Sequence, residues 1–105
     1  EAETRDLRAQ IELDIRLALD SLESADLQVA AAGEGLLLAE QELAQAERRF
    51  EAGVGSSIEA TGAQTRLERA RANRIDALFA HGMARIDLYS ALGTIAQMIS
   101  GGTNP

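Results

Sequence analysis

RRFEAGVGSSIE, residues 48–59, is the only clear break between two long helical patterns, and it decides the fold of this chain. Gly53 predicts the end of the first helix, because glycine adopts the left-handed conformation of a helix terminus without a Cβ penalty. Arg48 and Arg49 support this prediction, since positive charge is favourable beside the free carbonyl groups of a last helical turn. We therefore expect one helix to stop here.

The same stretch predicts where a second helix starts. Ser56 and Glu59 have the spacing of a capping box, in which the serine hydroxyl accepts from the Glu59 amide and the Glu59 carboxylate accepts from the Ser56 amide. Between the stop and the start only Val54 and Gly55 remain free, and so short a connection forces two helices to lie antiparallel and side by side. The stretch is expected to be the tip of a helical hairpin.

The sequences on both sides of the tip follow a seven-residue repeat. Two positions of each repeat face the partner helix and form the seam, and alanine occupies one of them. This pattern is typical of a coiled coil, and its small side chains allow two helix axes to approach closely. The expected fold class is all-α, a long antiparallel two-helix coiled-coil hairpin. The rows are Ile15, Leu22, Val29, Leu36, Leu43 and Phe50 with Ala18, Ala25, Ala32, Ala39 and Ala46 before the tip, and Ala63, Ala70, Ala77, Ala84 and Ala91 after it.

We expect a single helical hairpin over residues 1–105 with four parts. The first helix covers residues 3–52, the tip turn 53–56, and the second helix 57–93, with residue 99 as an alternative end. Gly93 is the expected stop of the second helix, and residues 100–105 are expected to form a flexible tail. The chain begins at Glu1 rather than at methionine, from which we expect a piece of a larger protein.

A second apolar strip lies off the seam on each expected helix. Such strips are wider than one facing helix would cover, so further helices are expected to pack against this hairpin. The chain by itself is expected to self-associate, because large exposed apolar patches on soluble chains mark interaction surfaces. The strips contain Leu37 and Leu38 on the first helix, and Ile75, Leu78, Phe79, Ile86 and Leu92 on the second.

Composition and charge argue against several classes of function. The net charge is −7 and the chain has no lysine, so a basic face for nucleic acid is not expected. The absence of cysteine removes thiolate catalysis and cysteine-based metal sites, and the single histidine, His81, is expected to occupy a seam position. No apolar run approaches the roughly 20 residues of a membrane helix. We expect no enzyme activity, no cofactor, no metal site and no membrane span.

The tip and its flanks together resemble TolC-like outer-membrane efflux proteins. The likeness covers nearly the whole chain, and it implies the periplasmic helical hairpin of that family's second repeat, within a homotrimeric outer-membrane channel of the Gram-negative envelope. The implied function is a passive export conduit, with the hairpin in the tunnel wall. The motifs are Arg49-Phe50-Glu51-Ala52-Gly53-Val54-Gly55-Ser56-Ser57-Ile58-Glu59-Ala60, then Ala63-Gln64-x-x-Leu67-x-x-Ala70, and finally Ala84-Arg85-x-x-Leu88-x-x-Ala91-Leu92-Gly93.

The resemblance also implies roles for individual tip residues. Glu59 would line the channel entrance. Gly55 and Gly62 stand where some members carry a gating Arg and a second entrance acid, and Phe50 replaces a latching Tyr, so a latch of that kind is not expected. A periplasmic efflux adaptor would dock on Phe50, Gly53, Val54, Gly55 and Ser56.

Two other interpretations of the sequence remain open at this point. A generic coiled-coil scaffold or signalling hairpin would show the same heptads, and Gly53, Ser56 and Glu59 would then serve only the turn. An efflux-adaptor hairpin would share the rod shape, but the Arg and Leu spacing of such a tip is not found. Phe50 and Val54 favour docking, because a turn alone has no use for exposed apolar side chains.

Overall fold

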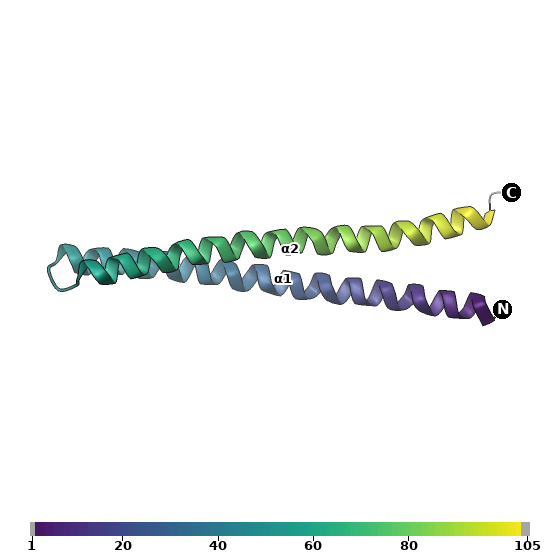
Figure 1. Ribbon diagram of the computed structural model, residues 1–105, viewed down its shortest axis with the longest axis horizontal. Coiled ribbons are helices and arrows are strands. Elements are labelled where there is room, and N and C mark those ends of the chain that lie inside the picture. The colour runs from purple at the N-terminus through teal and green to yellow at the C-terminus, as the bar shows by residue number, and fades with distance from the viewer. Residues whose placement is uncertain (1, 104–105) are drawn as a thin grey trace. The chain divides into compact units, whose positions relative to one another are not determined.

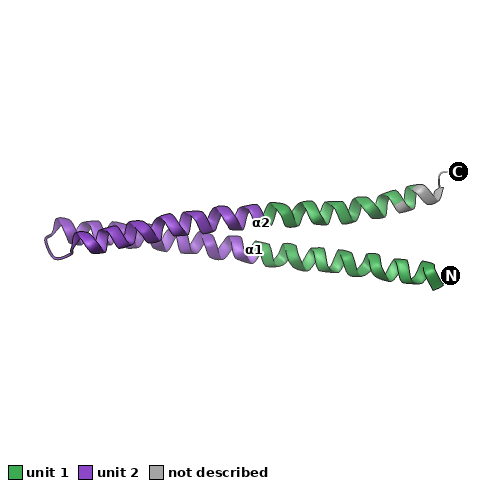
Figure 2. Cartoon of the chain, viewed as in Figure 1, with its two compact units in different colours: residues 1–26, 80–105 green, residues 27–79 purple. Residues whose placement is uncertain are grey.

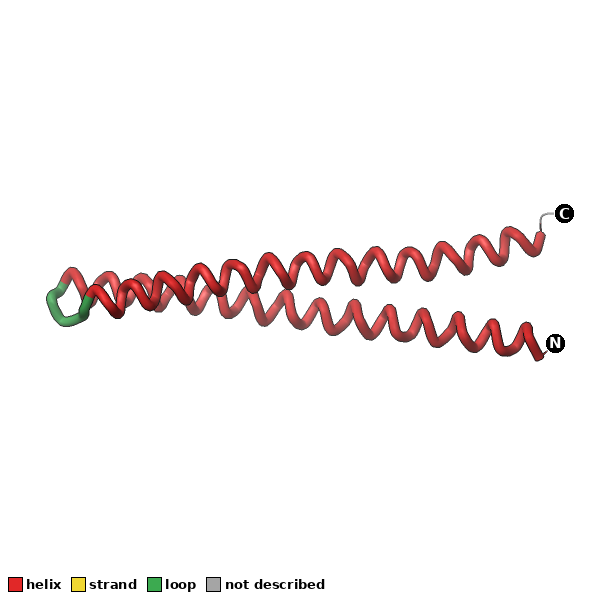
Figure 3. Tube along the Cα trace, in the orientation of Figure 1, coloured by secondary structure: helices red, strands yellow, loops and turns green. Residues whose placement is uncertain are grey.

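A computed structural model describes residues 2–103, and the side chains of residues 2–97, 99 and 100. Helix α1 spans Ala2–Glu51 and helix α2 spans Ser57–Thr103, with no strand among the described residues (Figure 1). In Figure 3 the loop residues among those described lie in the turn between the two helices. The predicted all-α helical hairpin is confirmed.

The helix boundaries differ from the sequence expectation mainly at the end of α2. Helix α1 runs from residue 2 to 51 rather than from 3 to 52, and α2 begins at Ser57. The expected stop at Gly93 is wrong, as is the flexible tail for residues 100–103, because α2 continues to Thr103. A helix-ending left-handed conformation occurs in the described residues at Gly53 and not at Gly93. Residues 104–105 of the expected tail lie outside the described residues.

The chain divides into two compact units, and each contains one segment of each helix (Figure 2). Unit 1 consists of residues 1–26 and 80–105, and unit 2 consists of residues 27–79, including the tip. Each unit is described here by itself.

In unit 2 the seam between the helices is built largely from alanine. Ion pairs show that the segments run antiparallel, because the step from Arg49–Glu59 to Glu42–Arg66 moves back along α1 and forward along α2 by the same number of residues. The predicted alanine rows are confirmed as the contact surface, since small side chains there leave room for close approach of two helices. The buried residues of this unit are Ala39, Ala46, Ala63, Leu67 and Ala77.

In unit 1 the seam contains Ala25 and Ala84, which are buried, and a polar contact beside them. His81 Nε2 lies 2.5 Å from Asp26 Oδ1, so the imidazole N–H of α2 donates to a carboxylate of α1. The half-buried state of His81 fits its expected seam position, whereas its partner Asp26 was not predicted. Towards the chain ends the seam is only half-buried, and an open groove of about 400 Å³ is lined by Thr4, Leu7, Arg8, Ile11, Glu12, Ile95 and Ile99.

The second apolar strips lie on the surface of each unit. In unit 2 Leu37, Leu38, Ile75 and Phe79 are exposed, and Phe79 retains 71% of its accessible surface. In unit 1 Ile86 and Leu92 are exposed in the same way. The seam therefore leaves these residues without cover within either unit, as the sequence predicts. No helix within residues 2–103 is apolar over a sufficient length to cross a membrane.

Candidate functional site

The C-terminal end of α1 is closed by backbone hydrogen bonds around Gly53. The Gly53 N–H donates to the Phe50 carbonyl at 3.0 Å, and the Val54 N–H donates to the Arg49 carbonyl at 3.0 Å. These two bonds form the Schellman arrangement, which requires a left-handed residue at the position that Gly53 occupies. Gly53 has a φ of +78°, so the predicted role of this glycine as the helix stop is confirmed.

The N-terminal end of α2 is capped by Ser56, but only half of the predicted capping box forms. The Glu59 N–H donates to Ser56 Oγ at 3.2 Å, as expected for an N-cap serine. The reciprocal bond from the Ser56 amide to the Glu59 carboxylate was predicted wrongly. The Glu59 carboxylate instead accepts from Arg49, because the antiparallel arrangement brings a guanidinium within its reach.

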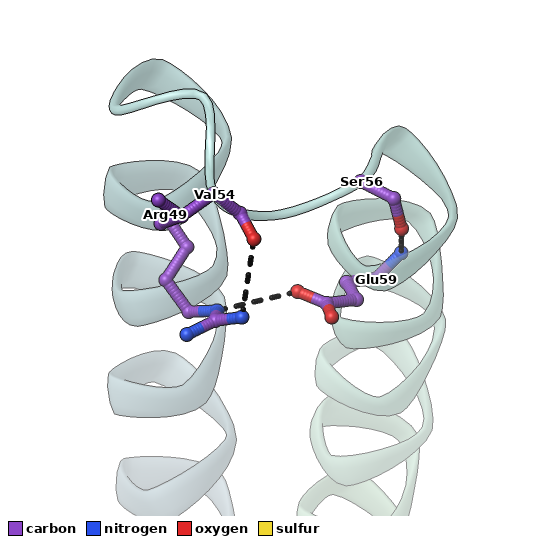
Figure 4. A network of polar contacts seen from close by, with 4 residues as sticks. All are labelled: Arg49, Val54, Ser56 and Glu59. Carbon is purple, nitrogen blue, oxygen red and sulfur yellow. Dashed lines mark hydrogen bonds and ion pairs between the residues drawn. The ribbon is translucent and has the colours of Figure 1, made fainter.

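A single arginine joins both helices and the turn (Figure 4). Arg49 Nε donates to Glu59 Oε2 at 3.4 Å, and the Arg49 terminal nitrogen Nη2 donates to the Val54 carbonyl at 3.3 Å. Arginine suits this role, since its planar guanidinium carries several N–H donors in a fixed fork. Arg49 was predicted only as a cation at a helix terminus. Opposite charges on the two sides of a short turn, ten residues apart, were the signal for this ion pair.

The structure favours glycine at Gly53 and at Gly55 for different physical reasons. A Cβ on Gly53 would meet no atom within 4 Å, so only its positive φ disfavours other residues. Gly55 does not share that positive φ, but a Cβ there would lie 2.9 Å from Arg49 Cβ and 3.0 Å from Glu59 Oε2. Its N–H also donates to the Arg49 carbonyl at 2.9 Å. Gly55 is therefore required by space rather than by conformation.

Three apolar residues in or next to the turn have exposed side chains. Val54 is 67% exposed, Phe50 is 52% exposed, and Ile58 in the first turn of α2 is 81% exposed. Phe50 and Val54 are among the predicted docking residues. Ile58 was not predicted, although its position next to the cap marks it as a tip residue. The tip thus combines a fixed backbone with exposed apolar side chains, an arrangement that can bind a partner.

No curated protein and no solved structure matches this chain. A family match does exist. The family described as Outer membrane efflux protein matches residues 2–94, which include the tip and most of both helices. The resemblance to TolC-like proteins is thereby confirmed, and the family is one of outer-membrane efflux channels. This hairpin, with its alanine seam and its glycine-closed tip, belongs to the outer membrane efflux protein family.

Proposed function

We propose that this hairpin forms part of the periplasmic tunnel wall of an efflux channel, as the helical hairpin of the second repeat. In this role the chain is a passive conduit element that catalyses no reaction, and its parent channel is a homotrimer. The observation that carries the proposal is the apolar strip that each unit exposes away from its seam.

Burial of the apolar strips against neighbouring helices would be energetically favourable. Fully burying one side chain the size of Leu, Ile or Phe is worth roughly 1.5–3 kcal/mol relative to leaving it in water. Unit 2 alone exposes Leu27, Leu37, Leu38, Ile75 and Phe79. Packing further helices against these residues would stabilise an assembly, whereas a generic two-helix scaffold would gain nothing from exposing them.

We further propose that the tip docks a periplasmic efflux adaptor. Phe50 and Val54 would contact the partner through their exposed side chains, while Gly53, Gly55 and Ser56 would present backbone and small groups beside them. Glu59 would lie at the channel entrance. Its charge there is already paired with that of Arg49, so the proposed docking contact is mainly apolar.

Site-specific crosslinking in the native cell envelope tests adaptor docking. Residues 1–105 contain no cysteine, so Val54→Cys introduces one thiol into the hairpin, to which a photoreactive maleimide can be attached. We expect a crosslink to a periplasmic adaptor, identified by mass spectrometry, when the hairpin is expressed with its native flanking sequence. Ser24→Cys, at an exposed position of unit 1, is the matched control and should not crosslink to that adaptor. Equal adaptor labelling from both positions, or none from Val54→Cys, would exclude tip docking.

A further inference from the structure

We infer that Arg49, Glu59 and Gly55 act as a clasp that fixes the shape of the tip before any partner binds. The three are positioning residues for the exposed Val54 side chain, and this role rests on the proposed docking function. The clasp is defined here as the Arg49–Glu59 ion pair together with the hydrogen bonds that Arg49 makes to Val54 and Gly55.

Arg49 holds both peptide groups of Val54. The Val54 N–H donates to the Arg49 carbonyl at 3.0 Å, and the Val54 carbonyl accepts from the Arg49 guanidinium at 3.3 Å. The backbone of Val54 is therefore tied on both sides while its side chain remains 67% exposed. A docking side chain on a fixed backbone loses less conformational entropy when it binds, which favours association.

The clasp also spans the whole turn. Arg49 lies in the last turn of α1 and Glu59 in the first turn of α2, so their ion pair at 3.4 Å joins the two helix ends directly. Opening of the turn would break this pair and the two bonds to Val54 together. The contacts of one arginine thereby make the turn a single cooperative unit.

Gly55 leaves the space that the clasp needs. A Cβ at Gly55 would lie 2.9 Å from Arg49 Cβ, 3.0 Å from Glu59 Oε2 and 3.2 Å from the Arg49 carbonyl carbon. Two of these atoms belong to or adjoin the backbone, so a flexible side chain cannot simply rotate away from the new methyl group. The contacts of the clasp can form only when residue 55 has no side chain. Gly55→Ala is therefore expected to disrupt them.

Amide hydrogen exchange tests the clasp without any partner. In the Gly55→Ala and Arg49→Ala variants, the Val54 amide should exchange at least threefold faster than in the unchanged chain, because its acceptor is displaced or freed to move. Gly62→Ala and Arg48→Ala are the matched controls. A Cβ at Gly62 meets only Arg66 Nη1 at 3.4 Å, which is ordinary contact, and the Arg48 side chain takes no part in the clasp. Unchanged Val54 exchange in both test variants would overturn the inference.

Adaptor binding then tests whether the clasp positions the docking surface. The probe is the purified adaptor that crosslinks to Val54→Cys, and binding is followed by surface plasmon resonance on the full protein. We expect Gly55→Ala and Arg49→Ala to slow association by about 1.4- to 5-fold, the factor that corresponds to the free energy of one exposed ion pair. The Arg49→Glu, Glu59→Arg double variant should recover part of the rate that either single change loses.

The possible outcomes separate the clasp from the proposed function. Faster Val54 exchange with slower association supports the inference, provided that helicity by circular dichroism is unchanged. Faster exchange with unaltered association would overturn the positioning role and leave docking intact. If the unchanged protein binds no adaptor, the proposed docking function fails, and the exchange measurement still decides whether the clasp exists.

Discussion

Two glycines inside α1 allow a sharp test of how this hairpin is stabilised. Gly33 and Gly35 lie in the helix without a positive φ, and a Cβ on either would meet no atom within 4 Å. Within the described residues neither glycine is therefore needed for close approach to another segment. A glycine in a helix interior costs about 0.8–1 kcal/mol relative to alanine, chiefly through backbone entropy. Gly33→Ala and Gly35→Ala should each stabilise the chain by about that amount.

The two effects should add, because residues two apart in a helix point in different directions. The double variant should gain about 1.6–2 kcal/mol. In a domain of this size 1 kcal/mol raises the melting temperature by roughly 4–8 °C. Thermal and urea unfolding followed by circular dichroism at 222 nm would measure the gain. The urea midpoint should rise with an unchanged m-value, since the surface exposed on unfolding stays the same.

Gly53→Ala is the matched control, with the opposite sign. Its new Cβ also meets no atom within 4 Å, but its φ of +78° makes an L-residue unfavourable by about 1–2 kcal/mol. A lower melting temperature for Gly33→Ala or Gly35→Ala would refute the reasoning. Such a result would mean that Gly33 or Gly35 permits a helix bend or a close contact that the described structure of α1 does not show.

Three further predictions concern the seam, the cap and the apolar strips. Ala63 is 1% exposed, so Ala63→Leu should overpack the seam and destabilise the chain by about 1–3 kcal/mol in urea unfolding; a gain in stability would contradict close helix contact. Ser56→Ala should cost about 1 kcal/mol through loss of the bond from the Glu59 amide, while Ser57→Ala should have little effect in the same assay. Ile75→Ser with Phe79→Ser should reduce self-association in sedimentation velocity, because both side chains are exposed. The double variant should lower the melting temperature only at protein concentrations at which the unchanged chain associates. An unchanged association state would argue against the strips as helix-packing surfaces.

The tip and the seam show how far local chemistry alone reaches in this protein. Gly53 and Ser56 could be assigned from sequence because helix termination and capping depend on atoms within a few residues. The alanine rows could be assigned because a seven-residue repeat turns one face of a helix towards its partner regardless of the rest of the chain. These features placed the turn and named the contact surface, including Ala39, Ala63 and Ala77.

The sequence by itself determined two helices, their turn and their seam, since each of these is encoded by spacing along one segment. Only the tertiary structure decided the partners of Glu59 and His81. Glu59 was expected to bond the Ser56 amide and instead pairs with Arg49, ten residues away, and His81 pairs with Asp26, 55 residues away. Such pairs depend on how one helix is shifted and rotated against the other. A heptad pattern does not specify these small shifts and rotations. Hydrogen bonds depend on them, because a change of a few tenths of an ångström in the donor–acceptor distance decides whether a bond forms.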